Sequence, residues 1–144
     1  MILSAQSIRK RKGMIEPFYE RTLDMGLTYG LGPAGYDFRI AEDVIILSQG
    51  FVKVSSIERF AIPCDLQGEV KDKSTWARRG ISVFNTVFDP GFRGWATIEI
   101  ANHSRYEIEI KAGMAIAQMI FEVLDEPTEL PYNGKFQDQP RGPQ

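Results

Sequence analysis

A basic segment near the middle of the chain carries residue types that bind phosphate. Lys73 is followed by the hydroxyls of Ser74 and Thr75, then by the guanidinium of Arg78 and by Gly80. Ammonium, guanidinium and hydroxyl groups at this spacing could surround phosphate oxygens with charge-assisted hydrogen bonds. The glycine pattern of a Walker loop is missing, so the segment is not a P-loop. A solvated basic turn is the competing interpretation.

Asp89 opens the sequence Asp-Pro-Gly-Phe-Arg-Gly, which is typical of a turn. Proline presets one backbone angle and glycine tolerates the left-handed conformation that follows. The structural interpretation is therefore the turn of a hairpin. The functional interpretation places the Asp89 carboxylate at the tip of that hairpin, where it could bind a sugar hydroxyl or orient a water molecule.

Glu99 lies in the middle of an expected strand at residues 97–101. If Ile98 and Ile100 occupy the inner face, Glu99 shares the opposite face with Thr97, because side chains alternate along a strand. A glutamate on such a face usually serves solubility. If the face lines a pocket instead, partial burial would raise the glutamate pKa and suit it to transfer protons.

The chain offers few side chains of the kind that bind zinc. It contains one cysteine, Cys64, and one histidine, His103, whereas a typical zinc site needs three or four such ligands. A hydrolase built on this chain would use a carboxylate to activate water, or a magnesium ion held largely by its substrate. No signature of a Cys–His nucleophile surrounds either residue, so the sequence favours a buried thiol and a surface imidazole.

Length and composition describe one domain. The chain has 144 residues, of which 43% are hydrophobic and 25% charged, which fits a single compact unit. Seventeen basic against nineteen acidic residues give a net charge of −2, so no overall basic field attracts nucleic acid or an anionic membrane. With one cysteine, no apolar leader and no apolar run long enough for a membrane, we expect a cytoplasmic protein.

Short strands dominate the expected secondary structure. Residues 4–13 predict a basic helix with Ser4 as its N-cap and Gly13 as its end. The glycines and prolines between residues 15 and 35 predict mostly loop and turn. Alternating or continuous apolar patterns predict strands at residues 36–40, 44–47, 51–54, 106–110 and 114–124, the last buried on both faces. The chain is therefore predicted to be an all-β sandwich or barrel.

The composition changes after Leu124, which divides the chain into a domain at residues 1–126 and a tail at 127–144. The tail is rich in proline, glycine and glutamine and nearly devoid of aliphatic residues, a composition that favours disorder. It also contains Tyr132, Lys135, Phe136 and Gln139, which are types that stack on a base or bind phosphate. A tail that folds over a ligand is the alternative.

Six sequence blocks follow one another along the chain, from Met1 to nearly the end of the tail. They read MILSAQSIRKR, PAGYDFRI, PCDLQGEVKDKSTWARRG, VFDPGFRGWATIEIAN, AGMAIAQMIFE and PYNGKFQDQ. In this order they resemble the dCTP deaminase family, a branch of the trimeric dUTPase superfamily. The resemblance implies a distorted dUTPase-like β-barrel with a short N-terminal helix, assembled as a homotrimer with active sites between subunits.

The same resemblance implies a reaction and a set of site residues. The family hydrolyses dCTP to dUTP and ammonia without zinc, with Mg²⁺ carried on the triphosphate, in pyrimidine deoxyribonucleotide metabolism. Its phosphate-binding segment matches residues 73–78, and its tail residues close over the nucleotide. The implied catalytic residues are Glu99, Ser74 and Arg78. The implied substrate-binding residues are Lys73, Ser74, Thr75, Arg78, Asp89, Thr97, Ile98, Glu99, Tyr132, Lys135 and Gln139.

Three features of the sequence depart from the family pattern. The segment between Gly80 and Asp89 is shorter than the family's base-binding hairpin. Lys73 stands where the family has an arginine. Trp76 stands where the family has an aliphatic residue, and this difference is interpreted as a change in packing. A dUTP diphosphatase, or a bifunctional enzyme that forms dUMP and diphosphate, is the alternative function, although Glu99 favours deamination. A module that binds nucleotides without turnover is the third hypothesis.

Overall fold

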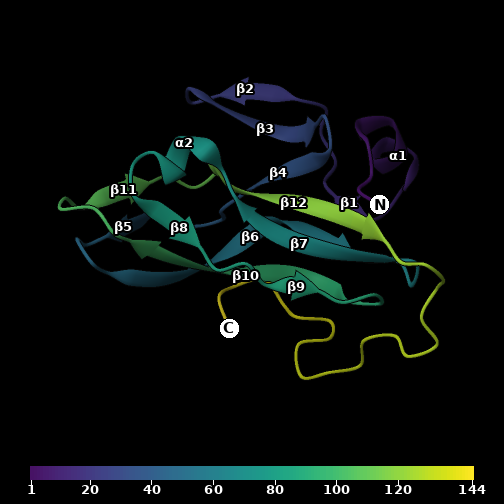
Figure 1. Cartoon of the computed structure of the whole chain (residues 1–144). Coiled ribbons are helices and arrows are strands. Elements are labelled where there is room, and N and C mark those ends of the chain that lie inside the picture. Colours follow the sequence, from purple (N-terminus) through teal and green to yellow (C-terminus); the bar gives the residue numbers. More distant parts are fainter.

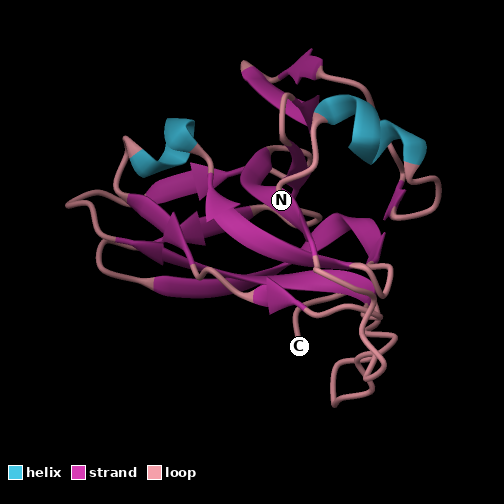
Figure 2. Ribbon diagram, turned by 45° about the vertical axis from the view of Figure 1, so that its right-hand side comes forward, coloured by secondary structure: helices cyan, strands magenta, loops and turns pink.

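Two antiparallel sheets face each other across the hydrophobic core in the computed structural model, which describes all residues from 1 to 144 (Figure 1). Strands make up most of the ordered backbone, and the helices are two short pieces (Figure 2). The elements are α1 (Ala5–Lys10), β1 (Ile15–Glu16), β2 (Thr22–Asp24), β3 (Leu27–Gly32), β4 (Gly35–Arg39), β5 (Val44–Ile46), β6 (Phe51–Ala61), β7 (Leu66–Asp72), α2 (Ser74–Ala77), β8 (Ile81–Val83), β9 (Val87–Phe88), β10 (Arg93–Asn102), β11 (Ile108–Ile110) and β12 (Ala115–Val123).

The six-stranded sheet has the order β2-β3-β4-β12-β7-β9 and the four-stranded sheet the order β1-β6-β10-β8, while β5 and β11 form a separate pair. Strand β12 is the central strand that its continuous apolar pattern predicts, since it pairs with β4 on one side and β7 on the other. The alternation predicted for β4 is also confirmed, because Tyr36 and Phe38 are fully buried. The all-β fold expected from the sequence is therefore correct.

The alternation predicted along β10 is confirmed as well. Ile98 and Ile100 are buried, while Thr97 and Glu99 on the opposite face are half-buried. Strand β10 pairs with β6 along most of its length, with a bulge between Trp95 and Thr97. The hydroxyl of Ser56 accepts a hydrogen bond from the bulged Ala96 amide at 2.8 Å, so the irregularity is satisfied within the sheet.

The stretch between residues 15 and 35, expected as loop and turn, contains strands β1, β2 and β3. Its glycines permit close approach of the backbone instead of breaking the strands. Gly30 has φ +89°, and a Cβ at this position would lie 2.5 Å from the carbonyl oxygen of Glu20. The expectation was wrong because β1 pairs with β6 and β3 pairs with β2 and β4, and the local sequence does not reveal this pairing.

The Asp-Pro-Gly turn does not close a hairpin. The Phe92 amide donates to the Asp89 carbonyl at 3.0 Å, so residues 89–92 do form a turn, but β9 pairs with β7 and β10 with β6. The turn therefore carries the chain from one sheet to the other. Strand β8 likewise pairs with β10, so the short segment before Asp89 also crosses between sheets.

The structure confirms some of the smaller expectations from the sequence and contradicts the one for Cys64. The N-terminal helix α1 is confirmed and begins after Ser4, although the Ser4 side chain makes no capping hydrogen bond. Cys64 is exposed and not buried, because it follows Pro63 in the surface turn that precedes β7. His103 is exposed as expected. No helix of the chain has the length and apolar character of a membrane span.

A buried ion pair joins the two sheets. Arg39 of β4 donates to the Glu58 carboxylate of β6 through Nε at 2.7 Å and through its main-chain amide at 2.9 Å. Glu58 is fully buried, and the guanidinium also lies over the rings of Tyr19 and Tyr29. Burial raises the pKa of Glu58, while the hydrogen bonds from Arg39 oppose that shift.

We predict that Arg39→Met destabilises the protein by about 3–5 kcal/mol, because it leaves the Glu58 carboxylate buried without its partner. Without the guanidinium the folded-state pKa of Glu58 lies further above its unfolded value. The loss of stability should therefore grow as the pH rises from about 5 to about 8. Urea unfolding at fixed protein concentration measures both effects.

The matched control is the double variant Arg39→Met/Glu58→Gln, which removes both charges and should recover a large part of the lost stability. Equal unfolding midpoints for the single and the double variant at both pH values would contradict the role of the ion pair.

Candidate active site

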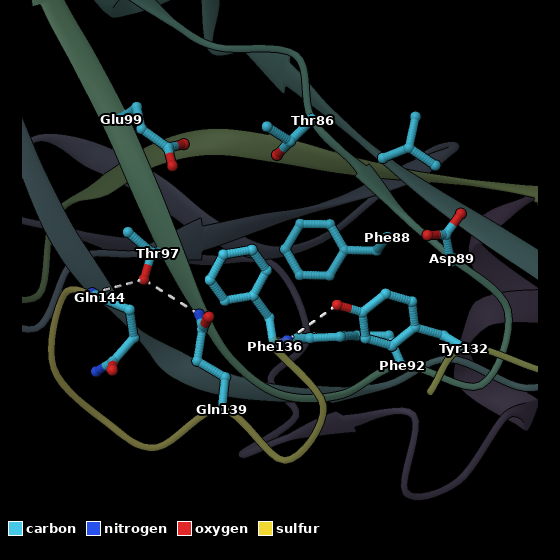
Figure 3. Close-up of a pocket in the computed structure, with 11 residues that line it drawn as sticks. Thr86, Phe88, Asp89, Phe92, Thr97, Glu99, Tyr132, Phe136, Gln139 and Gln144 are labelled. Atoms are coloured by element: carbon cyan, nitrogen blue, oxygen red, sulfur yellow. Dashed lines mark hydrogen bonds between the residues drawn. The ribbon is translucent and has the colours of Figure 1, made fainter. Parts of the chain in front are cut away.

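A cavity of about 310 Å³ opens where β9, β10 and the C-terminal tail meet (Figure 3). This volume is at the lower end of the range for small-molecule sites. Its lining combines apolar, hydroxyl, carboxamide and carboxylate side chains and no lysine or arginine. The lining residues are Thr86, Val87, Phe88, Asp89, Phe92, Thr97, Glu99, Tyr132, Phe136, Gln139 and Gln144.

Strand β10 supplies the polar wall of the cavity. Thr97 and Glu99 project from the same face of this strand into the cavity, with the Glu99 carboxylate turned toward Thr86 (Figure 3). The backbone of Glu99 is fixed on both sides, because it pairs with β6 and its carbonyl accepts a hydrogen bond from the Phe84 amide at 3.1 Å. A half-buried carboxylate in this position can exchange protons with a molecule bound in the cavity.

Aromatic side chains supply the opposite wall. Phe88 and Phe92 are buried and meet edge to face, with ring centroids 5.0 Å apart. The ring of Tyr132 continues this contact at 5.9 Å from Phe92. Asp89 stands exposed at the rim of the same wall. The arrangement offers an apolar surface for a planar ring or a sugar and a carboxylate beside it for a hydroxyl group.

The tail forms the third wall through polar contacts. The Gln139 side chain donates from Nε2 to the Trp95 carbonyl at 2.7 Å and to the Thr97 hydroxyl at 3.1 Å, and its backbone forms a parallel bridge with Gly94. A Cβ on Gly94 would lie 2.7 Å from the Gln139 amide nitrogen. The tail is thus positioned by hydrogen bonds and a close backbone approach, with little aliphatic burial.

Two further contacts hold the tail in place. Arg93 donates to the Asp138 carboxylate at 3.0 Å and lowers its pKa. The Tyr132 hydroxyl accepts a hydrogen bond from the Phe136 amide at 3.0 Å, which closes a small loop within the tail (Figure 3). The loop brings Tyr132 and Phe136 to the cavity together.

The predicted phosphate segment lies elsewhere in the single chain. Ser74, Thr75 and Arg78 are exposed on and after α2, on the opposite side of the molecule from the tail (Figure 1). Trp76 is buried and donates to the Ala115 carbonyl at 2.7 Å, which makes it the anchor of α2. The ammonium of Lys73 donates to the Thr28 hydroxyl at 3.3 Å and pairs closely with Asp37.

The structure therefore brings together five of the predicted site residues and leaves six apart. The five that line the cavity are Asp89, Thr97, Glu99, Tyr132 and Gln139. Ile98 points into the core, and Lys135 lines an adjoining groove that shares Phe136, Gln139 and Gln144 with the cavity. The remaining residues outside the cavity are Lys73, Ser74, Thr75 and Arg78.

Sequence reasoning missed part of the lining. Phe88 and Phe92 flank the Asp-Pro-Gly turn on either side, so aromatic residues around a candidate functional turn were the available signal. Thr86 and Gln144 carry no comparable signal. No group of three or more histidine, cysteine, aspartate or glutamate side chains gathers in a way that could hold a metal ion.

Comparison with known sequences gives a consistent result. The sequence profile described as dCTP deaminase-like matches residues 36–124. The dCTP deaminase of Campylobacter fetus is 35% identical over 93% of this chain and 89% of its own length. That of Acidobacterium capsulatum is 34% identical over 89% of this chain and 88% of its own length. That of Pyrococcus horikoshii is 31% identical over 98% and 94%, respectively.

Solved structures show the same fold. The 2'-deoxycytidine 5'-triphosphate deaminase of Agrobacterium tumefaciens superposes with a TM-score of 0.69 and 17% identity over 85% of this chain, which spans only 47% of that chain's length. The native EIAV dUTPase superposes with a TM-score of 0.61 and 20% identity over 85% and 93% of the two chains. A mutant dUTPase of Staphylococcus aureus phage phi11, described with a structural Mg(II) ion, has a TM-score of 0.62 at 18% identity and covers 85% and 94%. The expected dUTPase-like architecture is confirmed.

We predict that Gln139→Ala loosens the tail without unfolding the sheets. The variant loses two neutral hydrogen bonds, each contributing about 0.5–1.5 kcal/mol. Amide hydrogen exchange of residues 132–144, and of the Arg93 and Trp95 amides that donate to the tail, should therefore become about tenfold faster, with β7 and β12 unchanged. Gln67→Ala is the control, because the Gln67 carboxamide bonds only to Glu69. Unaltered exchange of the tail in the Gln139 variant would show that these bonds do not hold it.

Proposed function

The chain belongs to the dCTP deaminase-like family, and we propose that it hydrolyses dCTP to dUTP and ammonia. The observation that carries this proposal is the position of Glu99, half-buried on a core strand and lining the cavity beside Thr97. The relatives named dCTP deaminase support the choice of substrate and reaction.

Glu99 acts as the proton shuttle in this proposal. Its carboxylate takes a proton from a water molecule next to C4 of cytosine, and the resulting hydroxide adds to C4. The carboxyl group then passes the proton to the amino nitrogen. The bond between C4 and this nitrogen breaks and ammonia leaves. The proton of the remaining C4 hydroxyl group moves to N3, which gives the C4 carbonyl of uracil. The carboxylate is regenerated, so one residue serves as base and then as acid.

The other cavity residues bind and orient the nucleotide. Thr97, together with the backbone around Ile98, reads the edge of the base, and Asp89 binds a sugar hydroxyl against the aromatic wall. Tyr132, Lys135 and Gln139 belong to the tail, which closes over the nucleotide. These contacts place the base in one geometry before the chemical step, which lowers the entropic part of the barrier.

The triphosphate requires cations that the cavity lacks. It carries about four negative charges at neutral pH, whereas the charged side chains of the lining are Asp89 and Glu99. We propose a homotrimer in which α2 of a second copy brings Ser74, Thr75 and Arg78 to the cavity. Ser74 and Arg78 would hold the water and stabilise charge in the transition state. A phosphate contact from Lys73 requires that its pair with Asp37 opens.

Magnesium enters this proposal as part of the substrate complex. The chain gathers no cluster of three or more candidate ligands, so we propose that Mg²⁺ is held mainly by the triphosphate and by water, and that zinc takes no part. When bound, the ion offsets phosphate charge. We further propose that the reaction takes place in the cytoplasm, where it supplies dUTP as a precursor of dUMP and dTTP.

Asp89 favours a second candidate function. An exposed carboxylate at the rim of the cavity could orient a water molecule toward the phosphates, and the dUTPases among the structural neighbours share the fold. The alternative is therefore a dUTP diphosphatase, or a bifunctional enzyme that converts dCTP to dUMP and diphosphate.

We predict that the purified protein with dCTP and Mg²⁺ accumulates dUTP, and that Glu99→Gln lowers turnover by at least about a hundredfold, because it removes the proton shuttle. Chromatography of the products measures both. Glu107→Gln, at an exposed position that does not line the cavity, is the control. Formation of dUMP from dCTP would show the bifunctional reaction, and dCMP a direct diphosphatase. Undiminished turnover in the Glu99 variant would exclude the shuttle.

We also predict complementation between two inactive variants. Glu99→Gln and Arg78→Ala should each lose activity alone. Subunits mixed one to one and reassembled should regain about a quarter of the wild-type rate, because that fraction of shared sites pairs an intact Glu99 with an intact Arg78 from its neighbour. If mass spectrometry shows that the mixtures exchange subunits and they still have no activity, each site is built from one chain.

A further inference from the structure

Residues 141–144 form a strap along the outer face of the β6–β10 pair. The Arg141 guanidinium lies over the ring of Trp95 on β10, 5.5 Å from its centroid. The Gly142 amide donates to the hydroxyl of Ser55 on β6 at 3.1 Å. Both strands of the pair therefore hold the strap.

The strap reaches the cavity at Gln144, which is one of the lining residues. The Gln144 amide donates to the Thr97 hydroxyl at 3.1 Å (Figure 3). The main-chain oxygen of Gln144 accepts a hydrogen bond from the Lys53 ammonium at 2.5 Å. One residue of the strap thus covers Thr97, the side chain that stands beside Glu99 on the polar wall of the cavity.

The Thr97 hydroxyl has no free acceptor site while the strap is in place. A hydroxyl oxygen accepts two hydrogen bonds, and here they come from the Gln139 carboxamide and the Gln144 amide. Gln139 is buried and is also held by the Trp95 carbonyl and by a backbone bridge with Gly94, whereas Gln144 is exposed. A donor group that binds to Thr97 must therefore displace Gln144.

We propose that the strap is an autoinhibitory segment, which occupies the base-binding wall of the cavity and is displaced by the nucleotide. The inference rests on the proposed reading of the base at Thr97. The amino group of cytosine is a hydrogen-bond donor and the neighbouring ring nitrogen N3 is an acceptor, and the main chain of Gln144 also offers one donor and one acceptor at this wall. The strap and the edge of the base compete for Thr97.

The strap is held loosely enough for a ligand to displace it. Three of its residues are exposed and Gly142 is half-buried, so the strap buries little apolar surface and opens at a low free-energy cost. If the strap covers the wall in about two thirds to nine tenths of the molecules, the apparent affinity for the nucleotide falls by about three- to tenfold. The rest of the tail keeps its own contacts through Gln139.

The test is the dissociation constant of dCTP with Mg²⁺, measured by calorimetry in the Glu99→Gln background. Gly142 has φ +105°, a backbone conformation that other residues rarely adopt, so Gly142→Ala should release the strap and tighten binding by about three- to tenfold. Gly26→Ala is the matched control and should leave the affinity unchanged. Gly26 also has a positive φ, +75°, with open surroundings, and lies in the turn between β2 and β3.

A chain that ends at Pro140 is the second variant. It lacks the strap and keeps the hydrogen bonds of Gln139, so it should bind dCTP at least as tightly as the Gly142→Ala variant. With Glu99 intact, both changes should lower KM for dCTP by the same factor and leave kcat within about twofold. The shortened chain decides the outcome if the strap stays in place in Gly142→Ala.

The possible results separate the inference from the proposed function. A shortened chain that binds dCTP with an unchanged dissociation constant would show that the strap does not compete with the nucleotide. Weaker binding by the shortened chain would mean that the strap helps to hold the nucleotide. Either result would overturn the inference, while dCTP turnover by the wild type would leave the proposed function intact. Absence of dCTP binding and turnover in every variant and in the wild type would overturn both.

Discussion

The burial of Ile98 and Ile100 in the core decides the direction in which Glu99 points. Each of these side chains contributes about 1.5–3 kcal/mol by leaving water, and a slip of one residue would expose both and turn Glu99 into the core. The bulge between Trp95 and Thr97 is held by the Ser56 hydroxyl and fixes the register from there on. The candidate chemistry of the chain thus depends on apolar packing on the hidden face of one strand.

The outer face of the same strand also receives the tail. Gln139 binds Trp95 and Thr97, and Gly94 leaves room for the tail backbone. One strand therefore places the Glu99 carboxylate and the Thr97 hydroxyl in the cavity and holds the tail segment that lines it. Lys135 of the tail lies in the adjoining groove, whereas the other predicted phosphate-binding cations, Lys73 and Arg78, lie outside this unit, at the two ends of α2. This separation of charge from the carboxylates is the physical reason why a second copy of the chain belongs in the proposed site.

The parts of the structure that depend on local pattern could be predicted from the sequence. The period-two alternation of β10 and the continuous apolar run of β12 predicted their exposed and buried faces. Local pattern did not group Glu99, Thr97, Asp89, Tyr132 and Gln139, which line one cavity; only the resemblance to the family named them as parts of one site. Features that depend on distant partners could not be predicted. Strand β1, at the start of the stretch between residues 15 and 35, forms by pairing with β6, which comes much later in the chain. The turn at Asp89 crosses between sheets because β9 and β10 have different neighbours. The pairing of Lys73 with Asp37 joins positions 36 residues apart in sequence.

The most direct test of the central claim is a crystal structure of the Glu99→Gln variant soaked with dCTP and Mg²⁺. The account predicts that the side chain at position 99 lies within about 3.2 Å of the amino nitrogen or C4-bound water of cytosine. It also predicts that Arg78 of a neighbouring subunit reaches the same nucleotide. A cytosine bound away from β10, with the side chain of residue 99 turned to bulk solvent, would contradict it.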